Sequence, residues 1–243
     1  MKAIEIRNLT KKYAQKTVVD NLSLSINEGE LVGLLGVNGA GKTTTIKMLC
    51  CLTEPTSGDA LLKGRSILDA SHEVKKIIAV SPQETAIAPN LTVKENLELM
   101  AGVHGMSGKE ARKKTEEVIE SLSLQEVVKQ KSKTLSGGWQ RRLSIAMALI
   151  SQPEILFLDE PTLGLDILGR RELWRVIEGL KGKVTIILTT HYLEEAEALC
   201  DSICIMQKGK LKAFGTAEEL IKLAKTESFE DAFVKLAAEG GAE

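Results

Sequence analysis

Residues 36–43 read G-V-N-G-A-G-K-T and match the pattern G-x-x-x-x-G-K-[ST]. This stretch follows an apolar run, residues 31–35, and leads into a helical pattern over residues 42–52. Glycines at such a turn let backbone N–H groups curl around phosphate oxygens, while the lysine adds a positive charge and the threonine a magnesium ligand. The alternative is a glycine-rich turn with a chance lysine, but the strand–loop–helix context favours nucleotide binding. We call residues 36–43 the phosphate loop.

Short apolar runs alternate with helical patterns along most of the chain. The patterns predict strands at residues 3–8, 19–26, 31–35, 59–63, 77–81, 154–159, 184–190, 202–207 and 210–214. They predict helices at residues 42–52, 71–76, 92–102, 108–122, 138–151, 167–180, 192–199, 217–224 and 228–237. Three runs, residues 31–35, 155–158 and 184–188, are apolar throughout, which is typical of a buried parallel sheet. The expected fold is therefore α/β: a P-loop NTPase core with a mainly parallel sheet.

Two regions depart from this alternation. Closely spaced strands at residues 3–9, 18–26 and 30–36 predict an N-terminal antiparallel β portion. Residues 84–151 are almost purely helical in pattern, which predicts a helical subdomain inserted between core strands. One apolar stripe of that subdomain comprises Ala111, Thr115, Val118, Ile119 and Leu122. Capping boxes at Thr92–Glu95 and Thr216–Glu219 predict two helix starts.

The composition excludes several classes of protein. The 243 residues include 32 Lys and Arg against 33 Asp and Glu, and only 3% aromatics, which argues against a nucleic-acid partner. No run approaches the ~20 apolar residues that cross a bilayer, and the charged first nine residues do not resemble a signal peptide. A soluble cytoplasmic protein is expected. The four cysteines at 50, 51, 200 and 204 form no C-x-x-C pair, which favours reduced buried thiols over a metal site.

Two further stretches carry chemistry. The run I-L-F-L-D ends in Asp159, and a strand-end aspartate beside a phosphate loop is a second anchor for Mg²⁺. The next residue, Glu160, lies closer to the γ-phosphate and is placed to polarise an attacking water; two solvated acids are the alternative. Residues 135–142 read L-S-G-G-W-Q-R-R, a second glycine-rich helix start suited to an anion. We call residues 135–138 the signature segment.

The motifs together resemble those of one family. The order G-V-N-G-A-G-K-T-T (36–44), Gln83, L-S-G-G-W-Q (135–140), I-L-F-L-D-E-P (155–161), L-G-L-D (163–166) and His191 is similar to the nucleotide-binding subunits of ATP-binding-cassette (ABC) transporters. The match runs from residue 3 to about residue 215. The signature segment is its most diagnostic part, because most other P-loop NTPases lack it.

The resemblance implies a role for each matching residue. The implied catalytic residues are Glu160, His191 and Gln83, and the implied magnesium ligands are Thr43, Gln83 and Asp159. The implied nucleotide contacts are Tyr13, which would stack on adenine, Gly36, Asn38, Gly39, Ala40, Gly41, Lys42, Thr43, Thr44, Ser136, Gly137, Gly138 and Asp166. Asp166 would also join the active sites of two subunits. Trp139 departs from the family pattern, since a polar residue is usual there, and the sequence leaves its position open between the helical subdomain and a partner.

The resemblance also implies the assembly. ATP and Mg²⁺ would be bound between two head-to-tail copies, or a copy and a homologous subunit, docked through residues 82–97 on integral membrane permease subunits. The chain would then lie on the inner face of the cell membrane as a peripheral cytoplasmic subunit, hydrolysing ATP to drive transport. The stretches T-H-Y-L-E-E-A-E (190–197) and S-F-E-D-A-F-V-K-L (228–236) resemble exporters of the ABC-2 type, including multidrug, antibiotic and sodium exporters. Export is therefore the expected direction.

A single ABC ATPase domain is expected over residues 1–243. Its core would comprise residues 1–83 and 152–215, its helical subdomain residues 84–151, and a short helical extension residues 216–243. The main alternative is a non-transport ABC ATPase of the DNA repair or translation type. Residues 45–134 are too short for the coiled coil of repair proteins, and translation types usually carry two such cassettes. A regulatory module without turnover would not need Glu160, His191 and Gln83, and a P-loop kinase would not need the signature segment.

Overall fold

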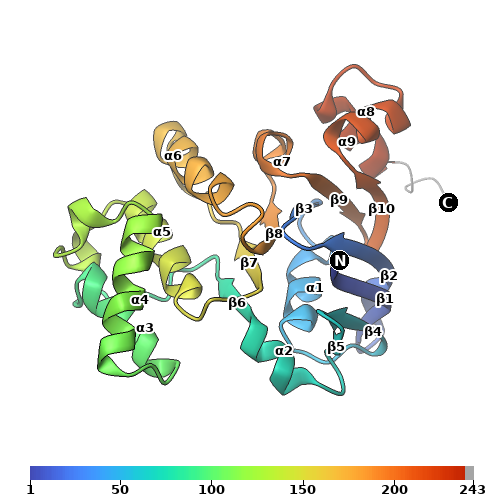
Figure 1. Cartoon of the computed structure of the whole chain (residues 1–243). Coiled ribbons are helices and arrows are strands. Elements are labelled where there is room, and N and C mark those ends of the chain that lie inside the picture. The colour runs from blue at the N-terminus through green and yellow to red at the C-terminus, as the bar shows by residue number, and fades with distance from the viewer. Residues whose placement is uncertain (239–243) are drawn as a thin grey trace.

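The larger of two sheets forms the centre of the molecule in the computed structural model, which describes residues 1–238 (Figure 1). Its strand order is β10-β9-β3-β8-β7-β6. The strands are β3 (Leu31–Leu35), β6 (Ile78–Ser81), β7 (Ile155–Asp159), β8 (Thr185–Thr190), β9 (Ser202–Gln207) and β10 (Lys210–Gly215). Only the β9–β10 pair is antiparallel among the pairs of this described sheet. The mainly parallel sheet predicted from the apolar runs is confirmed, and every residue of β3 and β8 is buried.

The second sheet is antiparallel and has the order β2-β1-β4-β5. Its strands are β1 (Lys2–Tyr13), β2 (Lys16–Asn27), β4 (Ser57–Leu62) and β5 (Arg65–Ser66). The predicted antiparallel portion is confirmed, but β1 and β2 are longer than expected because they pair along their whole length around a tight turn. One prediction was wrong: residues 30–36 do not join this portion. Their strand, β3, lies in the parallel sheet, as its burial on both faces requires.

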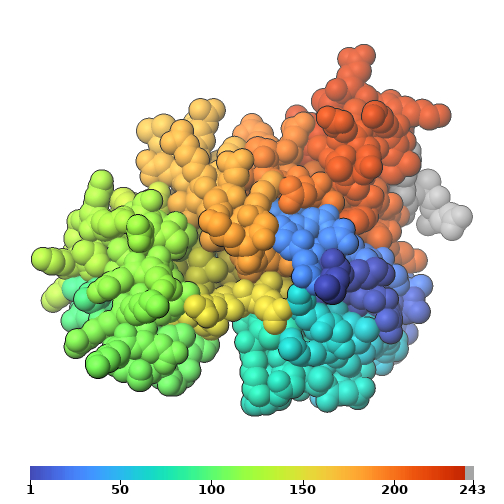
Figure 2. Space-filling view, in the orientation of Figure 1, coloured from blue at the N-terminus to red at the C-terminus, as the bar shows by residue number. Residues whose placement is uncertain are grey.

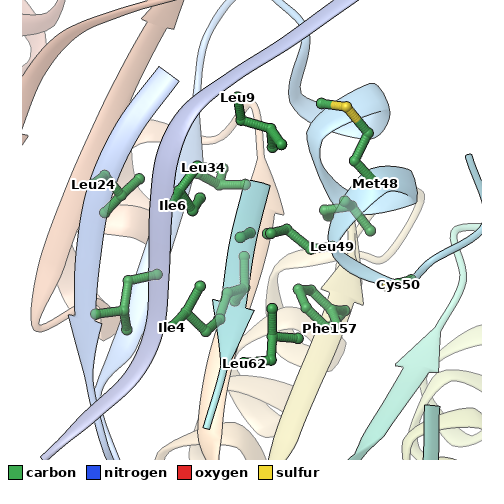
Figure 3. Close-up of a cluster of buried hydrophobic side chains, with 14 of the residues drawn as sticks. Ile4, Ile6, Leu9, Leu24, Leu34, Met48, Leu49, Cys50, Leu62 and Phe157 are labelled. Carbon is green, nitrogen blue, oxygen red and sulfur yellow. The ribbon is translucent and has the colours of Figure 1, made fainter. Parts of the chain in front are cut away.

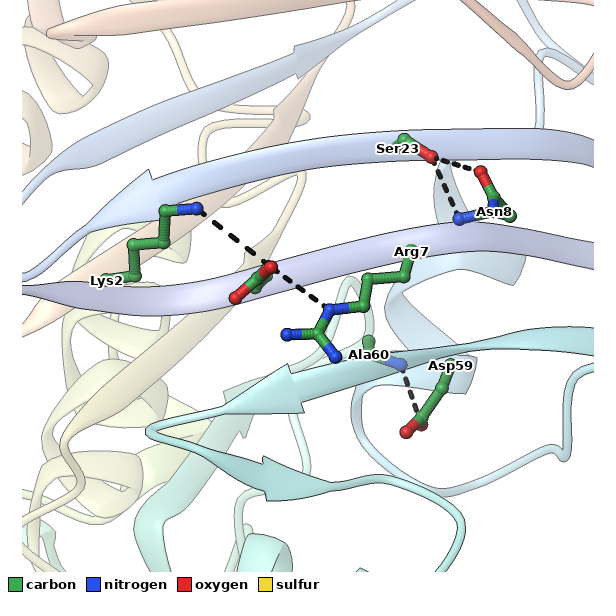
Figure 4. A network of polar contacts seen from close by, with 7 residues as sticks. Lys2, Arg7, Asn8, Ser23, Asp59 and Ala60 are labelled. Atoms are coloured by element: carbon green, nitrogen blue, oxygen red, sulfur yellow. Dashed lines mark hydrogen bonds and ion pairs between the residues drawn. The ribbon is translucent and has the colours of Figure 1, made fainter.

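The outer face of the antiparallel sheet carries polar contacts between neighbouring strands (Figure 4). The Glu5 carboxylate accepts a 3.0 Å hydrogen bond from Arg7 Nε and lies 4.0 Å from Lys2 Nζ. Ser23 on β2 bonds both the backbone N–H and the side chain of Asn8 on β1. The bond from Arg7 holds the pKa of Glu5 below its usual value. These groups are exposed, so they set strand register and solubility more than stability.

The main hydrophobic core lies between the two sheets (Figure 3). Helix α1 (Lys42–Leu49) packs there through Met48 and Leu49, against Ile4 and Leu62 of the antiparallel sheet and Phe157 of the parallel sheet. All five of these side chains are at most 1% exposed. The helix that begins inside the phosphate loop is thus held from both sides, and the loop inherits that rigidity.

The opposite face of the parallel sheet is covered by helices, including a lobe visible at one side of the molecule (Figure 2). We call α3 (Val93–Val103), α4 (Gly108–Ser121) and α5 (Gly137–Leu149) the helical lobe. Helix α6 (Ile167–Glu178) packs against α5. The predicted stripe on α4 is confirmed as buried: Ala111, Thr115, Val118, Ile119 and Leu122.

Residues 84–151 are less helical than predicted. Residues 84–91 form an irregular segment, and only short 3₁₀ turns, Gln125–Val127 and Ser132–Thr134, lie between α4 and α5. The buried Asn96 side chain holds the irregular segment: its Oδ1 accepts from the Ala88 N–H at 2.8 Å, and its Nδ2 donates to Ser132 Oγ at 2.8 Å. The Asn96 side chain thus supplies hydrogen bonds to this segment, in place of the backbone hydrogen bonds of the helix that the sequence pattern predicted.

The remaining helices are α2 (Ser71–Ile77), α7 (Leu193–Leu199), α8 (Ala217–Ala224) and α9 (Phe229–Ala238). The last three pack over β9 and β10 around the buried Phe229. The predicted C-terminal extension reaches residue 243, and residues 239–243 lie outside the described residues. None of the helices within residues 1–238 is long and apolar enough to cross a membrane.

Two of the four cysteines, Cys50 and Cys204, are buried as predicted, and Cys51 and Cys200 are half-buried. All four are free thiols, and burial raises the pKa of Cys204 to about 12. The described residues contain no cluster of three or more His, Cys, Asp or Glu side chains with metal-binding geometry.

Candidate functional site

The candidate residues follow the carboxyl ends of four neighbouring parallel strands, so they lie at one edge of the sheet. The order β3-β8-β7-β6 places, side by side, the phosphate loop after β3, His191 after β8, Glu160 after β7 and Gln83 after β6. Leu35 pairs with Thr190, and Asp159 pairs with Thr189, so the strand ends are level. Ligands bind at this carboxyl edge of open α/β sheets. Gln83 lies two residues beyond the end of β6.

The phosphate loop is braced from outside by the turn between β9 and β10. The Gly209 N–H donates to the Ala40 carbonyl at 3.0 Å, and the Gly209 carbonyl accepts from the Asp20 N–H at 2.9 Å. Gly41 begins α1 with φ 105°, a conformation that favours glycine. Backbone bonds from a distant hairpin thus fix the curve of the loop.

Lys42 is buried beneath its own loop. It is 7% exposed, and its Nζ donates to the Gly36 carbonyl at 2.5 Å. Burial lowers the pKa of the Lys42 ammonium, while the nearby Glu160 and Asp159 carboxylates act in the opposite direction. The Lys42 ammonium is thus held at the loop by the Gly36 carbonyl, which a phosphate oxygen can replace as its partner.

Asp159 and Glu160 are fixed by one threonine of the neighbouring strand. The Thr189 hydroxyl donates to Asp159 Oδ1 at 2.5 Å and accepts from the Glu160 N–H at 3.0 Å. Glu160 has a left-handed backbone conformation with φ 47°, which costs a non-glycine residue about 1 kcal/mol or more. Glu160 Oε2 lies 3.2 Å from His191 Nδ1.

These residues surround a cavity of about 660 Å³. Its lining comprises Val18, Gly36, Val37, Asn38, Gly39, Ala40, Gly41, Lys42, Thr43, Thr44, Gln83, Glu160, Leu163 and His191. The predicted phosphate-loop residues and the three predicted catalytic residues therefore meet at one cavity. Val18 and Leu163 were not predicted, because a lone apolar residue at a strand start or in a loop carries no motif. Asp159 is not part of the lining but lies within electrostatic range of Lys42.

The donor set fits a magnesium ion bound together with phosphate. Thr43 and Gln83, which carry a hydroxyl and an amide, line the cavity, and the Asp159 carboxylate at the end of β7 accepts a bond from Thr189. Mg²⁺ prefers such oxygen ligands and takes the rest of its shell from substrate phosphates and water. A complete cage of protein carboxylates is not expected for this ion, in agreement with the absence of such a cluster in residues 1–238.

The signature segment opens into a different cavity of about 290 Å³. The cavity is lined by Ser136, Gly137, Gly138, Trp139, Arg142, Gly164, Leu165, Asp166, Leu168, Gly169, Glu172 and Leu173. No residue lines both this cavity and the phosphate-loop cavity. Ser136 is the N-cap residue of α5 but makes no side-chain cap bond, so the first N–H groups of the helix have no partner from it. Asp166 caps α6 by accepting the Gly169 N–H at 2.7 Å.

The structure places Trp139, which the sequence left open. The ring is half-buried against the helical core, and the Arg142 guanidinium lies over it, 4.4 Å from the centroid. Arg142 in turn lies 3.5 Å from a Glu172 carboxylate oxygen on α6. Trp139 therefore packs within the chain and joins α5 to α6.

Tyr13 is the one predicted nucleotide contact that lines neither the phosphate-loop cavity nor the cavity of the signature segment. It ends β1 at 48% exposure and does not line the phosphate-loop cavity. Lys11 Nζ lies 5.0 Å from the ring centroid instead. Stacking of Tyr13 on adenine stays a prediction.

A protein-family model described as "ABC transporter" matches residues 19–163 of the chain. The match covers both the phosphate loop and the signature segment. The chain belongs to this family. Its fold is that of an ABC ATPase domain, as the resemblance of its motifs predicted.

Curated relatives cover most of the chain. A Nod factor export ATP-binding protein of Burkholderia orbicola is 42% identical over 90% of this chain and 72% of its own length. The probable multidrug ABC transporter ATP-binding protein YbhF of Escherichia coli is 38% identical over 96% of this chain. The chain spans only 41% of the length of YbhF.

Solved structures share the fold. A structure described as the ATP binding subunit of an ABC transporter has a TM-score of 0.83 and 30% identity, and the match covers 96% of this chain and 99% of that one. A dimeric structure of the ATP-binding cassette MJ0796 bound to ADP and Pi has a TM-score of 0.76 and 29% identity, over 88% of this chain and 98% of that one. An ABC ATPase fold with the antiparallel portion and the helical lobe is thus established.

Proposed function

We propose that this chain is the ATP-binding and ATP-hydrolysing subunit of an ABC exporter. The observation that carries the proposal is the phosphate-loop cavity, where four adjacent strands bring Lys42, Glu160, His191 and Gln83 together. The names of the relatives, a Nod factor exporter and a probable multidrug transporter, support export as the direction.

The proposed reaction assigns one task to each side chain. Backbone N–H groups of the loop bind the β- and γ-phosphates, and Lys42 exchanges the Gly36 carbonyl for phosphate oxygens. Glu160 accepts a proton from the attacking water, and His191 contacts the γ-phosphate and orients the Glu160 carboxylate. Thr43, Gln83 and Asp159 would hold Mg²⁺, which neutralises charge on the phosphates when bound.

The proposed active unit is a head-to-tail dimer. Within one chain, the phosphate loop and the signature segment face separate cavities. In a two-fold dimer, the free N–H groups at the start of α5 would bind the γ-phosphate held by the other copy, or by a homologous subunit. The dimeric ADP- and Pi-bound relative supports this arrangement. Asp166, which borders the signature cavity, would then lie at the subunit interface.

The proposed membrane partner is a separate permease. Helix α3 follows the Gln83 segment and exposes Leu99 and Val103 at 49% and 70%. Through this partner the chain would be peripheral to the inner face of the cell membrane. Co-purification from detergent-solubilised membranes tests the partner, and a Leu99→Glu/Val103→Glu variant that still captured the same membrane protein would argue against docking on α3.

The variant Glu160→Gln tests the proposed reaction. It keeps the size and the hydrogen-bonding capacity of the side chain but removes the base, so steady-state ATP hydrolysis should fall by about 10²–10⁴-fold. Equilibrium ATP binding should stay near normal, and ATP should now trap the dimer, as light scattering would detect. Glu154→Gln is the matched control. Glu154 directly precedes β7, at the opposite end of the strand from Glu160, and pairs with Lys63 and Arg65 on the surface. Normal turnover by Glu160→Gln would contradict the assignment of the base.

A further inference from the structure

A stack of side chains connects α6 to the reaction centre. The Arg170 guanidinium lies over the Tyr192 ring, with Cζ 4.3 Å from the centroid. The Tyr192 ring lies against the His191 imidazole, with 4.2 Å between centroids and 37° between planes. His191 Nδ1 then lies 3.2 Å from Glu160 Oε2. Three successive contacts thus lead from a helix to the proposed catalytic carboxylate, and the reaction as proposed uses only the last of them.

Two members of the stack, Tyr192 and Arg170, are fixed by hydrogen bonds from their backbone N–H groups. The Tyr192 N–H donates to Thr190 Oγ1 at 3.0 Å, directly after β8. Arg170 lies in the first turn of α6, where its N–H donates to the Asp166 carbonyl at 3.0 Å. Arg170 therefore stands one turn from Asp166, the residue that the proposed dimer places at the subunit interface.

The surroundings of Arg170 keep its guanidinium on the ring. The side chain lines a groove between α6 and α7 with Ile167, Arg171, Trp174, Glu194, Glu197 and Ala198. Its Nε is buried and has no hydrogen-bond partner among the described residues. The buried Glu195 carboxylate on α7 lies within electrostatic range of Arg170 and accepts a 3.0 Å bond from Trp174 Nε1. A cation over an aromatic ring contributes about 0.5–2 kcal/mol, more when water is excluded.

His191 needs such support. Its side chain is 41% exposed, so without a neighbour on the ring face the imidazole would rotate freely between rotamers. Only one orientation brings Nδ1 to Glu160. A ring fixed by stacking loses little entropy when it meets the γ-phosphate, which is the general benefit of preorganisation.

We propose that Arg170 is a positioning residue for ATP hydrolysis, holding His191 against Glu160 through the Tyr192 ring. This inference rests on the proposed function of His191 and Glu160. Because Arg170 is one turn from Asp166, the stack also links the interface end of α6 to the phosphate-contacting histidine. Movement of α6 on dimer closure would reach His191 through the stack.

Steady-state kinetics of four variants test the stack. Arg170→Gln and Tyr192→Ala should each lower kcat by about 10-fold with an unchanged KM for ATP, since they affect orientation and not binding. Tyr192→Phe keeps the ring and should recover most of the activity lost in Tyr192→Ala. Arg171→Gln is the matched control, because Arg171 is an exposed neighbour in the same groove, and it should behave as wild type. Wild-type kcat in both Arg170→Gln and Tyr192→Ala would overturn the proposal.

A spectroscopic measurement separates positioning from general destabilisation. The chain has 3 histidines, so the imidazole C–H signals in a ¹H–¹³C spectrum can be assigned by single substitutions. The ring current of Tyr192 should shift the His191 signals, and Arg170→Gln and Tyr192→Ala should both move them while Tyr192→Phe does not. Unmoved His191 signals in a folded Arg170→Gln variant would overturn the proposal even if its kcat fell.

A double-mutant comparison distinguishes this inference from the proposed function. His191→Ala should lower kcat, and adding Arg170→Gln should lower it no further, because both changes act on one side chain. Multiplied losses would mean that Arg170 acts by another route. If His191→Ala hydrolysed ATP normally, the assignment of His191 would be wrong and this inference would fall with it. If only His191→Ala were slow, the proposed function would stand without the stack.

Discussion

At the scale of single residues, backbone conformation determines which side chains are possible around the phosphate loop. Gly209 has φ 81°, and a Cβ built there would lie 2.5 Å from the Val18 carbonyl oxygen. Gly64 has a similar φ of 78°, but a Cβ there would meet nothing within 4 Å. The two glycines therefore separate the cost of a left-handed backbone from the cost of a steric clash.

Gly209→Ala should lower the free energy of unfolding more than Gly64→Ala. The left-handed conformation costs about 1–2 kcal/mol in either variant, and the clash with the β2 backbone adds about 1–3 kcal/mol at Gly209 alone. Urea denaturation measures both. Equal losses would mean that the chain relieves the clash between the added methyl group and the Val18 carbonyl at no cost.

At this scale, the sequence predicted the residues whose side-chain chemistry phosphate binding and hydrolysis require. Lys42, Glu160 and His191 were identified by motif, and all three line one cavity. Trp139 could not be placed from the sequence, because an indole next to two glycines suits either a buried or an exposed position. In the structure, the Trp139 ring contacts Arg142 on the same helix. This contact forms because Arg142 is buried and Trp139 is half-buried against the helical core.

At the scale of elements, local sequence signals predicted where helices begin, but not the short strand β5 or the irregular segment before α3. The two predicted capping boxes are confirmed at Thr92–Glu95 and Thr216–Glu219, and a third at Ser107–Glu110 was missed. Such caps depend only on neighbours in the sequence, so they are readable without tertiary structure. Strand β5 has only two residues, paired with the neighbouring β4, which is too short for a periodic pattern. The irregular residues 84–91 are held by Asn96, whose side chain also bonds Ser132, and periodicity does not predict such a contact.

The packing of α7 on α6 places an ionisable group in the core. Glu195 is fully buried, and desolvation raises its pKa above the ordinary value, a change only partly opposed by the bond from Trp174 Nε1 and by the nearby Arg170. A carboxyl whose folded-state pKa is raised stabilises the fold below the unfolded pKa of about 4.5, and that contribution is lost as pH rises through the folded value.

Glu195→Gln should therefore stabilise the protein relative to wild type increasingly as pH rises from 4 towards neutrality. The Gln oxygen can still accept the bond from Trp174, so the packing of the two helices is kept. Thermal unfolding of both proteins between about pH 4 and 8 gives the difference in Tm. Glu194→Gln, an exposed neighbour, is the control and should show no such trend. A difference in Tm that shrank with rising pH would contradict the buried-carboxyl argument.

At the scale of the whole molecule, the chain is only half of the proposed active unit. Its two glycine-rich helix starts, at α1 and α5, face separate cavities. Within one chain, the phosphate loop and the signature segment line no cavity in common, although Gln83 and Gly137 border one further pocket. A second copy supplies the missing contact with no change in fold.

Ser136→Arg should abolish ATP-dependent dimerisation. Ser136 is exposed at the start of α5, so an arginine is accommodated in the monomer but fills the space where the partner's phosphate would bind. Light scattering in the Glu160→Gln background measures closure, while the ATP affinity of the monomer should stay near that of Glu160→Gln alone. Ser121→Arg, at the exposed end of α4, is the control. Normal closure by Ser136→Arg would contradict a role of the signature segment across the interface.

The sequence by itself determined the phosphate loop, the buried parallel strands, the helix caps and the identity of the acids and histidine. These features depend on residue type and short-range periodicity, which the sequence states directly. Only the tertiary structure decided that β3, β8, β7 and β6 are neighbours and that the two glycine-rich helix starts open into different cavities. It also placed the Arg170 guanidinium over the Tyr192 ring, which lies against His191. Strand order and side-chain stacking bring together residues that are far apart in the chain. They depend on how whole faces of helices and sheets pack, and a short sequence pattern carries no information about that packing.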